Sequence, residues 1–175
     1  MTKANCIDYP RKGLYLVLTV PMLGMYVWIA VFLARQGIAY LMIYAGLFVL
    51  VAVFQSYVCV HWGCPYVGRF APCVGGFCLP SSQLARLFKG VKRSERTYKI
   101  METLAFVCFF GIILFPLYFL YRHSLWFLLG YLFVVGGYAT AFLLLICPVC
   151  ATRKVCPGGQ TAVQLQKALK RSNSQ

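Results

Sequence analysis

Residues 13–60 read GLYLVLTVPMLGMYVWIAVFLARQGIAYLMIYAGLFVLVAVFQSYVCV, which is two long apolar runs separated only by the three residues 35–37. About 20 apolar residues in a helix are enough to cross the hydrocarbon core of a bilayer. Residues 13–34 and residues 38–60 therefore each predict a membrane-spanning helix. The short break between them predicts that the two spans form a tight antiparallel hairpin.

The second half of the chain repeats this arrangement. Residues 101–121 and residues 125–146 are again long and apolar, and again three residues separate them. The 175-residue chain is 61% hydrophobic and only 11% charged, which is more apolar surface than a water-soluble fold of this size can bury. The sequence predicts an all-α integral membrane protein, a single membrane domain over residues 1–175, with four transmembrane helices arranged as two hairpins.

The basic residues indicate the orientation of these spans. Fifteen of the 17 Lys and Arg residues lie outside the two short breaks, on the side that carries both termini and the long middle loop, and only Arg35 and Arg122 lie opposite. By the positive-inside rule, both termini and the middle loop are expected in the cytoplasm, and the protein in the cytoplasmic (inner) membrane. Attraction of basic loops to anionic lipid explains the net charge of +14, so we expect no nucleic-acid partner.

The similar layout of the two halves is consistent with an internal parallel repeat of residues 13–82 and residues 101–160, although any protein with four spans and short outer loops shows comparable spacing. In the first half, apolar and basic residues alternate at helical spacing, which predicts an interfacial amphipathic helix over residues 83–99. Residues 161–175 form a basic C-terminal tail, whose first part is a weaker candidate for a second amphipathic helix, one that fits a membrane surface or a soluble partner.

Eight of the nine cysteines gather on the predicted cytoplasmic side, in cysteine-rich loops next to the spans. Cys108 is the exception, because it lies inside the third span and is expected to be a small buried apolar residue. Structural disulfides are rare in a reducing compartment, so a cysteine group there indicates metal or redox chemistry. The predicted metal ligands are Cys59, Cys64, Cys73, Cys78, Cys147, Cys150, Cys156 and, as an eighth, Cys6.

Two chemistries fit these thiols. Eight cysteines are the number that two 4Fe-4S clusters need, and proline after a ligand stiffens the backbone around an iron-sulfur cluster. Since no run has ferredoxin spacing, each cluster must draw ligands from both loops. Zinc is the alternative, because Cys147-x2-Cys150 with Cys156 supplies thiolates at the spacing of a tetrahedral zinc site. Three cysteines precede a proline: Cys64, Cys147 and Cys156.

The order of two spans, a Cys-Pro motif, two spans and a second Cys-Pro motif resembles the four-helix core of the NapH-type membrane iron-sulfur proteins. The matching positions are Cys59 with Cys64-Pro65 and Cys150 with Cys156-Pro157, although both spacers are longer than in that family. The resemblance implies iron-sulfur clusters at the cytoplasmic face and electron transfer between quinol and partner redox subunits.

The function that we expect from the sequence is that of an electron-transfer or anchor subunit, without a reaction of its own, that links a cytoplasmic redox protein to membrane quinone. His61 and Trp62 are the candidate cofactor-binding residues at the mouth of the second span, with an ordinary interfacial histidine as the alternative. Two further functions stay open: a thiol-disulfide or quinone oxidoreductase that uses Cys147 and Cys150, and a membrane scaffold or carrier for zinc or another soft metal. Small residues in the fourth span serve hairpin packing or an oligomer contact equally well.

Overall fold

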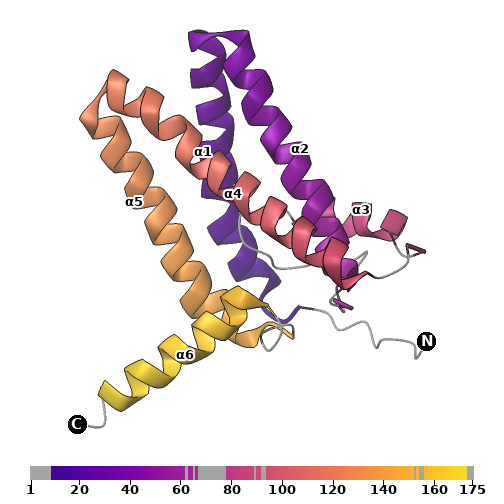
Figure 1. The fold of residues 1–175 in the computed structure, drawn as a ribbon. Coiled ribbons are helices and arrows are strands. Elements are labelled where there is room, and N and C mark those ends of the chain that lie inside the picture. The colour runs from indigo at the N-terminus through magenta and orange to yellow at the C-terminus, as the bar shows by residue number, and fades with distance from the viewer. Residues whose placement is uncertain are drawn as a thin grey trace.

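The computed structural model describes residues 9–61, 63–64, 66, 78–88, 90–91, 94–151, 153 and 156–172, and every regular element in them is a helix. In Figure 1 the long helices are inclined to one another rather than parallel, and the shorter elements lie towards one end of the fold. The elements are α1 (Lys12–Gln36), α2 (Ile38–His61), α3 (Cys78–Leu84), the 3-10 helix η2 (Ala85–Phe88), α4 (Glu95–His123), α5 (Leu125–Ala141), the π-helix η3 (Phe142–Ile146), the 3-10 helix η4 (Cys147–Val149) and α6 (Pro157–Ser172).

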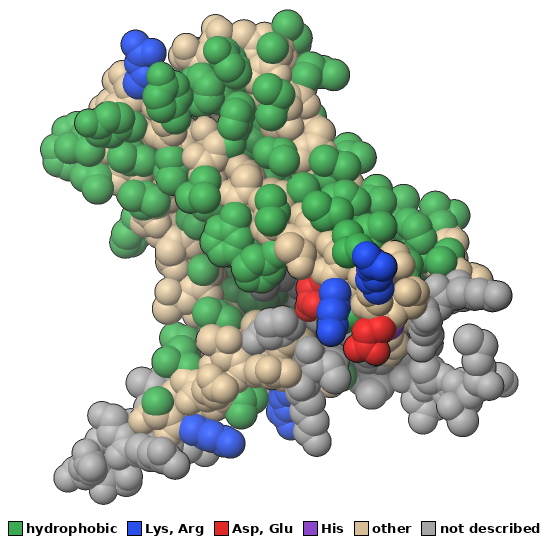
Figure 2. Space-filling view, viewed as in Figure 1, with side chains coloured by type: hydrophobic (Ala, Val, Ile, Leu, Met, Phe, Trp, Pro, Cys, Tyr) green, Lys and Arg blue, Asp and Glu red, His purple; other side chains and the backbone are tan. Residues whose placement is uncertain are grey.

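Four helices are long and apolar enough to cross a membrane, as the sequence predicts for a membrane protein. They cover Lys12–Gln36, Ile38–His61, Glu95–His123 and Leu125–Val149. The third begins at Glu95 rather than at residue 101, because the polar turns that precede the apolar run are also helical. Figure 2 shows hydrophobic side chains over most of the face formed by the long helices, and most of the charged ones near the end that carries α6.

A single residue interrupts the chain between paired helices. The N–H of Gly37 donates to the carbonyl of Leu33 at 3.0 Å, and the N–H of Ser124 donates to the carbonyl of Leu120 at 2.9 Å. Each bond satisfies a carbonyl in the last turn of a helix just before the next helix begins. The breaks are therefore shorter than the three residues predicted, and Arg35 and Arg122 belong to the last turns of α1 and α4.

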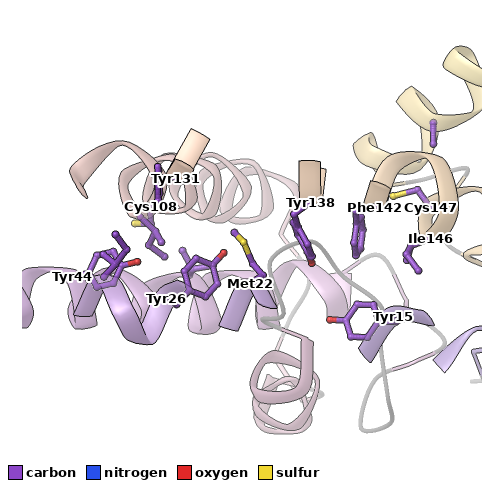
Figure 3. Close-up of a cluster of buried hydrophobic side chains, with 14 of the residues drawn as sticks. Tyr15, Met22, Tyr26, Tyr44, Cys108, Tyr131, Tyr138, Phe142, Ile146 and Cys147 are labelled. Carbon is purple, nitrogen blue, oxygen red and sulfur yellow. The ribbon is translucent and has the colours of Figure 1, made fainter. Parts of the chain in front are cut away.

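One stripe of α1 faces the interior along the whole length of the helix. Its buried residues follow one another at alternating steps of four and three, the spacing that places side chains on one face of an α-helix. Figure 3 shows several of them in line with buried tyrosines of α2 and α5, ending near Cys147. The buried residues of α1 are Tyr15, Thr19, Met22, Tyr26, Ile29 and Leu33.

Tyrosine hydroxyls in this core compensate for backbone groups. Pro116 in α4 lacks the N–H that would bond the carbonyl of Ile112. The hydroxyl of Tyr131 in α5 donates to the adjacent carbonyl, that of Ile113, at 2.9 Å. This bond fastens α5 to the part of α4 around Pro116.

The segment 83–99 is not the single amphipathic helix that the sequence predicts. It is divided among the end of α3, the 3-10 helix η2 and the first turn of α4. The reason is that α3 docks on α2, where the Ser56 hydroxyl donates to the carbonyl of Ser81 at 3.0 Å and Ala85 is fully buried. Leu87, by contrast, is 76% exposed, so the apolar residues of this segment do not share one face.

The residues before α1 attach to the end of the fourth span. The π-helix η3 alters the usual hydrogen-bond register, and side chains from the other end of the chain bind two of its carbonyls. The Tyr9 hydroxyl donates to the carbonyl of Ile146 at 3.2 Å, and the Arg11 guanidinium donates to that of Leu145 at 2.9 Å. These bonds place the start of α1 against the cysteine-bearing end of α5.

Candidate functional site

The predicted metal ligands are described to different extents. Cys59, Cys64, Cys147, Cys150 and Cys156 are placed with their side chains. Cys6, Cys73 and Trp62 lie outside the described residues, and only the backbone of Cys78 is described, as the first residue of α3. Cys108 is buried in α4 as predicted, with 8% of its surface exposed.

The end of α2 brings Cys59 and Cys64 together. Gly63 has φ +63°, its N–H donates to the carbonyl of Val60 at 3.1 Å, and the N–H of Cys64 donates to the carbonyl of Cys59 at 3.1 Å. These two bonds and the left-handed glycine form a Schellman motif, which places the residue after the glycine against the helix residue five positions earlier. The thiols of Cys59 and Cys64 are accordingly hydrogen-bonded to each other. The way in which α2 ends therefore explains why two cysteines with C-x4-C spacing lie next to each other.

The end of the fourth span presents its cysteines differently. Cys147–Val149 form one 3-10 turn, in which the N–H of Cys150 donates to the carbonyl of Cys147 at 3.2 Å. Side chains three residues apart in a 3-10 turn point the same way. Cys147 is buried, with 6% of its surface exposed, while Cys150 is half-buried.

Cys156 is the N-cap of α6. Its carbonyl accepts the N–H of Gln160 at 3.0 Å, and its sulfur accepts the backbone N–H groups of Gly158 and Gly159. Pro157 follows at the first helical position, where its missing N–H has no consequence. Helix N-termini favour negative charge, so these amides stabilise a thiolate at this position.

Tyr66 connects the two sets of cysteines. Its hydroxyl accepts the N–H of Ala151 at 3.2 Å, its side chain is hydrogen-bonded to Cys150, and its ring meets that of Tyr9 edge-on at 6.4 Å. Cys64 interacts electrostatically with both Tyr66 and Cys156. Thiols that follow α2 and thiols that follow α5 are therefore neighbours at one end of the bundle.

Burial and mutual proximity keep these groups protonated. The hydrogen bond from Cys59 and then burial raise the pKa of the Cys64 thiol. Burial, followed by the neighbouring Cys150 and Cys64, raises the pKa of Cys156, although the amides of Gly159 and Gly158 act in the opposite direction. Burial also raises the pKa of Tyr66. Buried, protonated thiols are poor nucleophiles, whereas metal coordination deprotonates them.

Space beside the sulfurs is provided by a glycine. A Cβ atom added to Gly158 would lie 3.9 Å from Cys147 Sγ and 4.0 Å from Cys156 Sγ. Both sulfurs thus face the same point on the first turn of α6. Within the described part of the chain, no three His, Cys, Asp or Glu side chains form a group that could hold a metal ion. The arrangement is a set of neighbouring thiols rather than a closed coordination shell.

His61 lies on another side of the end of α2. Its ring stacks on that of Tyr98 in α4, with 4.2 Å between centroids and 10° between planes. Its Nδ1 is buried and has no hydrogen-bond partner among the described residues. An unsatisfied buried nitrogen of this kind costs roughly 1–3 kcal/mol, so it is a position at which a ligand gains a hydrogen bond.

Sequence reasoning missed Tyr66 and Tyr9 as parts of this site. The sequence did carry a signal for Gly158, because glycines next to cysteine ligands let the backbone wrap closely round a metal centre and point amides at it. The tyrosines gave none, because a tyrosine beside a span is ordinarily an interfacial residue, and their roles depend on contacts with residues 137 and 85 positions away.

Comparison of this chain with protein-family models, with curated proteins and with solved structures finds no match.

Proposed function

We propose that this protein is a membrane electron-transfer subunit. It binds one or more iron-sulfur clusters through cysteine ligands at its cytoplasmic face and links a cytoplasmic redox partner to membrane quinone. The observation that carries the proposal is the convergence of thiols from two distant segments at one end of the bundle, Cys64 after α2 and Cys147, Cys150 and Cys156 after α5. The two-hairpin topology is inferred from the short breaks between the spans and the cytoplasmic position of both termini from the charge distribution, and both belong to this proposal.

The donor set fits a soft metal centre. Thiolates are the ligands of iron-sulfur clusters and of structural zinc. Cys64, Cys147, Cys150 and Cys156 are the described residues that would hold the centre, and binding must draw their sulfurs closer together. Gly158 leaves room beside two of these sulfurs, and the amides at the start of α6 offset negative charge there. When bound, a cluster supplies one-electron redox chemistry.

An iron-sulfur cluster and a structural zinc ion require different surroundings in a protein. An electron carrier benefits from an apolar, partly dry environment that tunes its potential. Cys147 is buried and Tyr66 and Tyr9 are 2% exposed, so the described surroundings have this character. The same burial disfavours Cys147 and Cys150 as an exchanging dithiol, because thiol–disulfide exchange requires access to a thiolate.

His61 is the group that we assign to quinone. It ends α2, at the boundary between the apolar span and the cysteine-rich segment, and its buried Nδ1 lacks a partner among the described residues. A histidine nitrogen at that depth donates or accepts the hydrogen bond that a quinone carbonyl or quinol hydroxyl requires.

Purification under anaerobic conditions, followed by iron, sulfide and zinc analysis and EPR, tests the proposal. We expect a brown protein whose visible absorption is bleached by dithionite, with iron and acid-labile sulfide in equal amounts. The Cys108→Ala variant is the matched control, since it removes a thiol from the bundle interior and should leave the iron content unchanged. A colourless protein with stoichiometric zinc would replace this proposal with the zinc scaffold, and a protein free of metal would refute both.

A further inference from the structure

A groove of about 560 Å³ lies where the fourth span ends and α6 begins. Pro148, in the last turn of the span, forms one wall, and the first turns of α6 form the other. Its polar and basic lining consists of Arg153, Gln160, Gln164, Gln166 and Lys167. It lies at the depth at which an apolar span gives way to lipid headgroups.

The cations of this groove are placed by the fold. Arg153 Nη1 donates to the carbonyl of Pro148 at 2.7 Å, which holds the guanidinium at the span end and uses one of the five N–H donors that a guanidinium carries. Gln160, Gln164 and Lys167 succeed one another at steps of four and three and so share one face of α6. A guanidinium, an ammonium and three amides around one groove are donors suited to a phosphate group.

Close packing of α6 on the loop before it creates the groove. A Cβ atom on Gly159 would lie only 2.7 Å from the carbonyl oxygen and 2.9 Å from the carbonyl carbon of Arg153. Only glycine permits this approach. Ala162, one turn further along α6, is fully buried. The helix therefore rests directly on the span end, and Figure 1 shows it crossing the end of α5 at a steep angle and projecting to one side of the bundle.

The charges near the groove favour an anionic ligand. The sequence from residue 124 to residue 175 contains no Asp or Glu, so no carboxylate of this segment neutralises Arg153 or Lys167. Leu145, in the π-helix just before the groove, is 40% exposed and offers apolar surface beside it. Apolar surface next to paired cations matches an amphiphile with a phosphate headgroup.

We propose that the groove between α6 and the end of the fourth span binds the phosphate headgroup of an anionic phospholipid, with Arg153 and Lys167 as the cations and the acyl chains against the span. The bound lipid holds α6 at the membrane surface.

The test uses the full chain in detergent, with phosphatidylglycerol as the probe and phosphatidylcholine as the neutral reference, and native mass spectrometry to measure bound lipid. We expect phosphatidylglycerol to be retained in preference to phosphatidylcholine. The double variant Arg153→Gln, Lys167→Gln should weaken its binding about tenfold, because each basic residue near an anionic headgroup contributes separately.

The double variant Arg96→Gln, Lys99→Gln is the matched control, since it removes the same charge from exposed positions at the start of α4. It should bind phosphatidylglycerol as the unmodified chain does. Equal weakening in both double variants would show unspecific surface attraction and overturn the proposal. Binding of inorganic phosphate as tight as that of phosphatidylglycerol would overturn the proposal, because it would assign the groove to a free anion. Equal retention of phosphatidylcholine would also overturn the proposal, because it would show that headgroup charge has no role in binding.

Discussion

The ends of α2 and of α5 occupy similar places in the two halves of the chain, yet different backbone conformations position the cysteines that follow them. At the end of α2, a left-handed Gly63 closes a Schellman motif and joins Cys59 to Cys64. At the end of α5, the helix passes through a π-helix into a 3-10 turn, and a third cysteine caps a new helix. Neighbouring thiols therefore do not require a repeated motif, because several helix endings place sulfurs on the same side.

Removal of one thiol from each end tests whether the two ends act together. If both ends hold one shared centre, Cys64→Ser and Cys156→Ser should each abolish nearly all bound iron, because a cluster missing one of four thiolates is not retained. Iron analysis after anaerobic purification measures this, with Cys108→Ser as the control. Loss of only half the iron in each variant would mean that each end holds its own centre.

The two glycines that follow Cys156 should differ sharply when replaced. Gly159→Ala places a methyl group against the backbone of Arg153 and should destabilise the chain by about 1–3 kcal/mol, since α6 must move. Gly158→Ala meets only the sulfurs of Cys147 and Cys156 at ordinary contact distances and should cost much less. Thermal unfolding of both variants in detergent measures the difference, and equal midpoints would contradict the packing of α6 described above.

At the end of α2, the sensitive feature is backbone conformation rather than space. Gly63 has φ +63° and no atom within 4 Å of an added Cβ, so Gly63→Ala should cost about 1 kcal/mol through the left-handed conformation alone. Gly46→Ala is the matched control, because Gly46 lies within α2 with similar open space and should be neutral or slightly stabilising. Thermal unfolding again provides the measurement, and the reverse order of the two midpoints would exclude the Schellman ending.

Among the described residues, side chains of the N-terminal segment hydrogen-bond to backbone carbonyls near the end of the fourth span, and a smaller change tests that attachment. Tyr9→Phe removes the hydrogen bond to the carbonyl of Ile146 and should lower the free energy of unfolding by about 0.5–1.5 kcal/mol. Tyr40→Phe is the control at the opposite end of the bundle, where the ring of Tyr40 packs on Phe119. Similar losses in both variants would show that the Tyr9 bond does not contribute.

The same tyrosine predicts an alkaline effect. Burial raises the pKa of Tyr9 from 10.0 to about 12, so the folded chain holds this proton more tightly than the unfolded chain does. Its contribution to stability is complete below about pH 10 and is lost as the pH rises towards 12. The stability gap between the unmodified chain and Tyr9→Phe should therefore narrow over this range. A gap that stays constant in pH-dependent unfolding experiments would contradict the burial of the hydroxyl.

The fold was largely predictable because long apolar runs have few alternatives to helix. The four spans and their short breaks were predicted to within a few residues, except for the first turns of α4. The division of residues 83–99 among three helical elements was not predicted, since it depends on the docking of Ser81 and Ala85 on α2. In the candidate site, cysteine spacing indicated ligands from both halves, but Tyr66 and Tyr9 acquire their positions only through contacts distant in the sequence.

Sequence composition, together with the length of the apolar runs, predicted a membrane protein of four long helices with thiols near the span ends, because these two properties decide partition into lipid. It did not determine which face of each helix turns inward, since the spans are apolar all round and lipid solvates an outward leucine as well as a neighbouring helix does. Tertiary packing made that choice, by burying the stripe from Tyr15 to Leu33 and by pairing hydroxyls with backbone carbonyls. The same packing brought Cys64 beside Cys156, because these side chains meet only when the ends of distant helices share one end of the bundle.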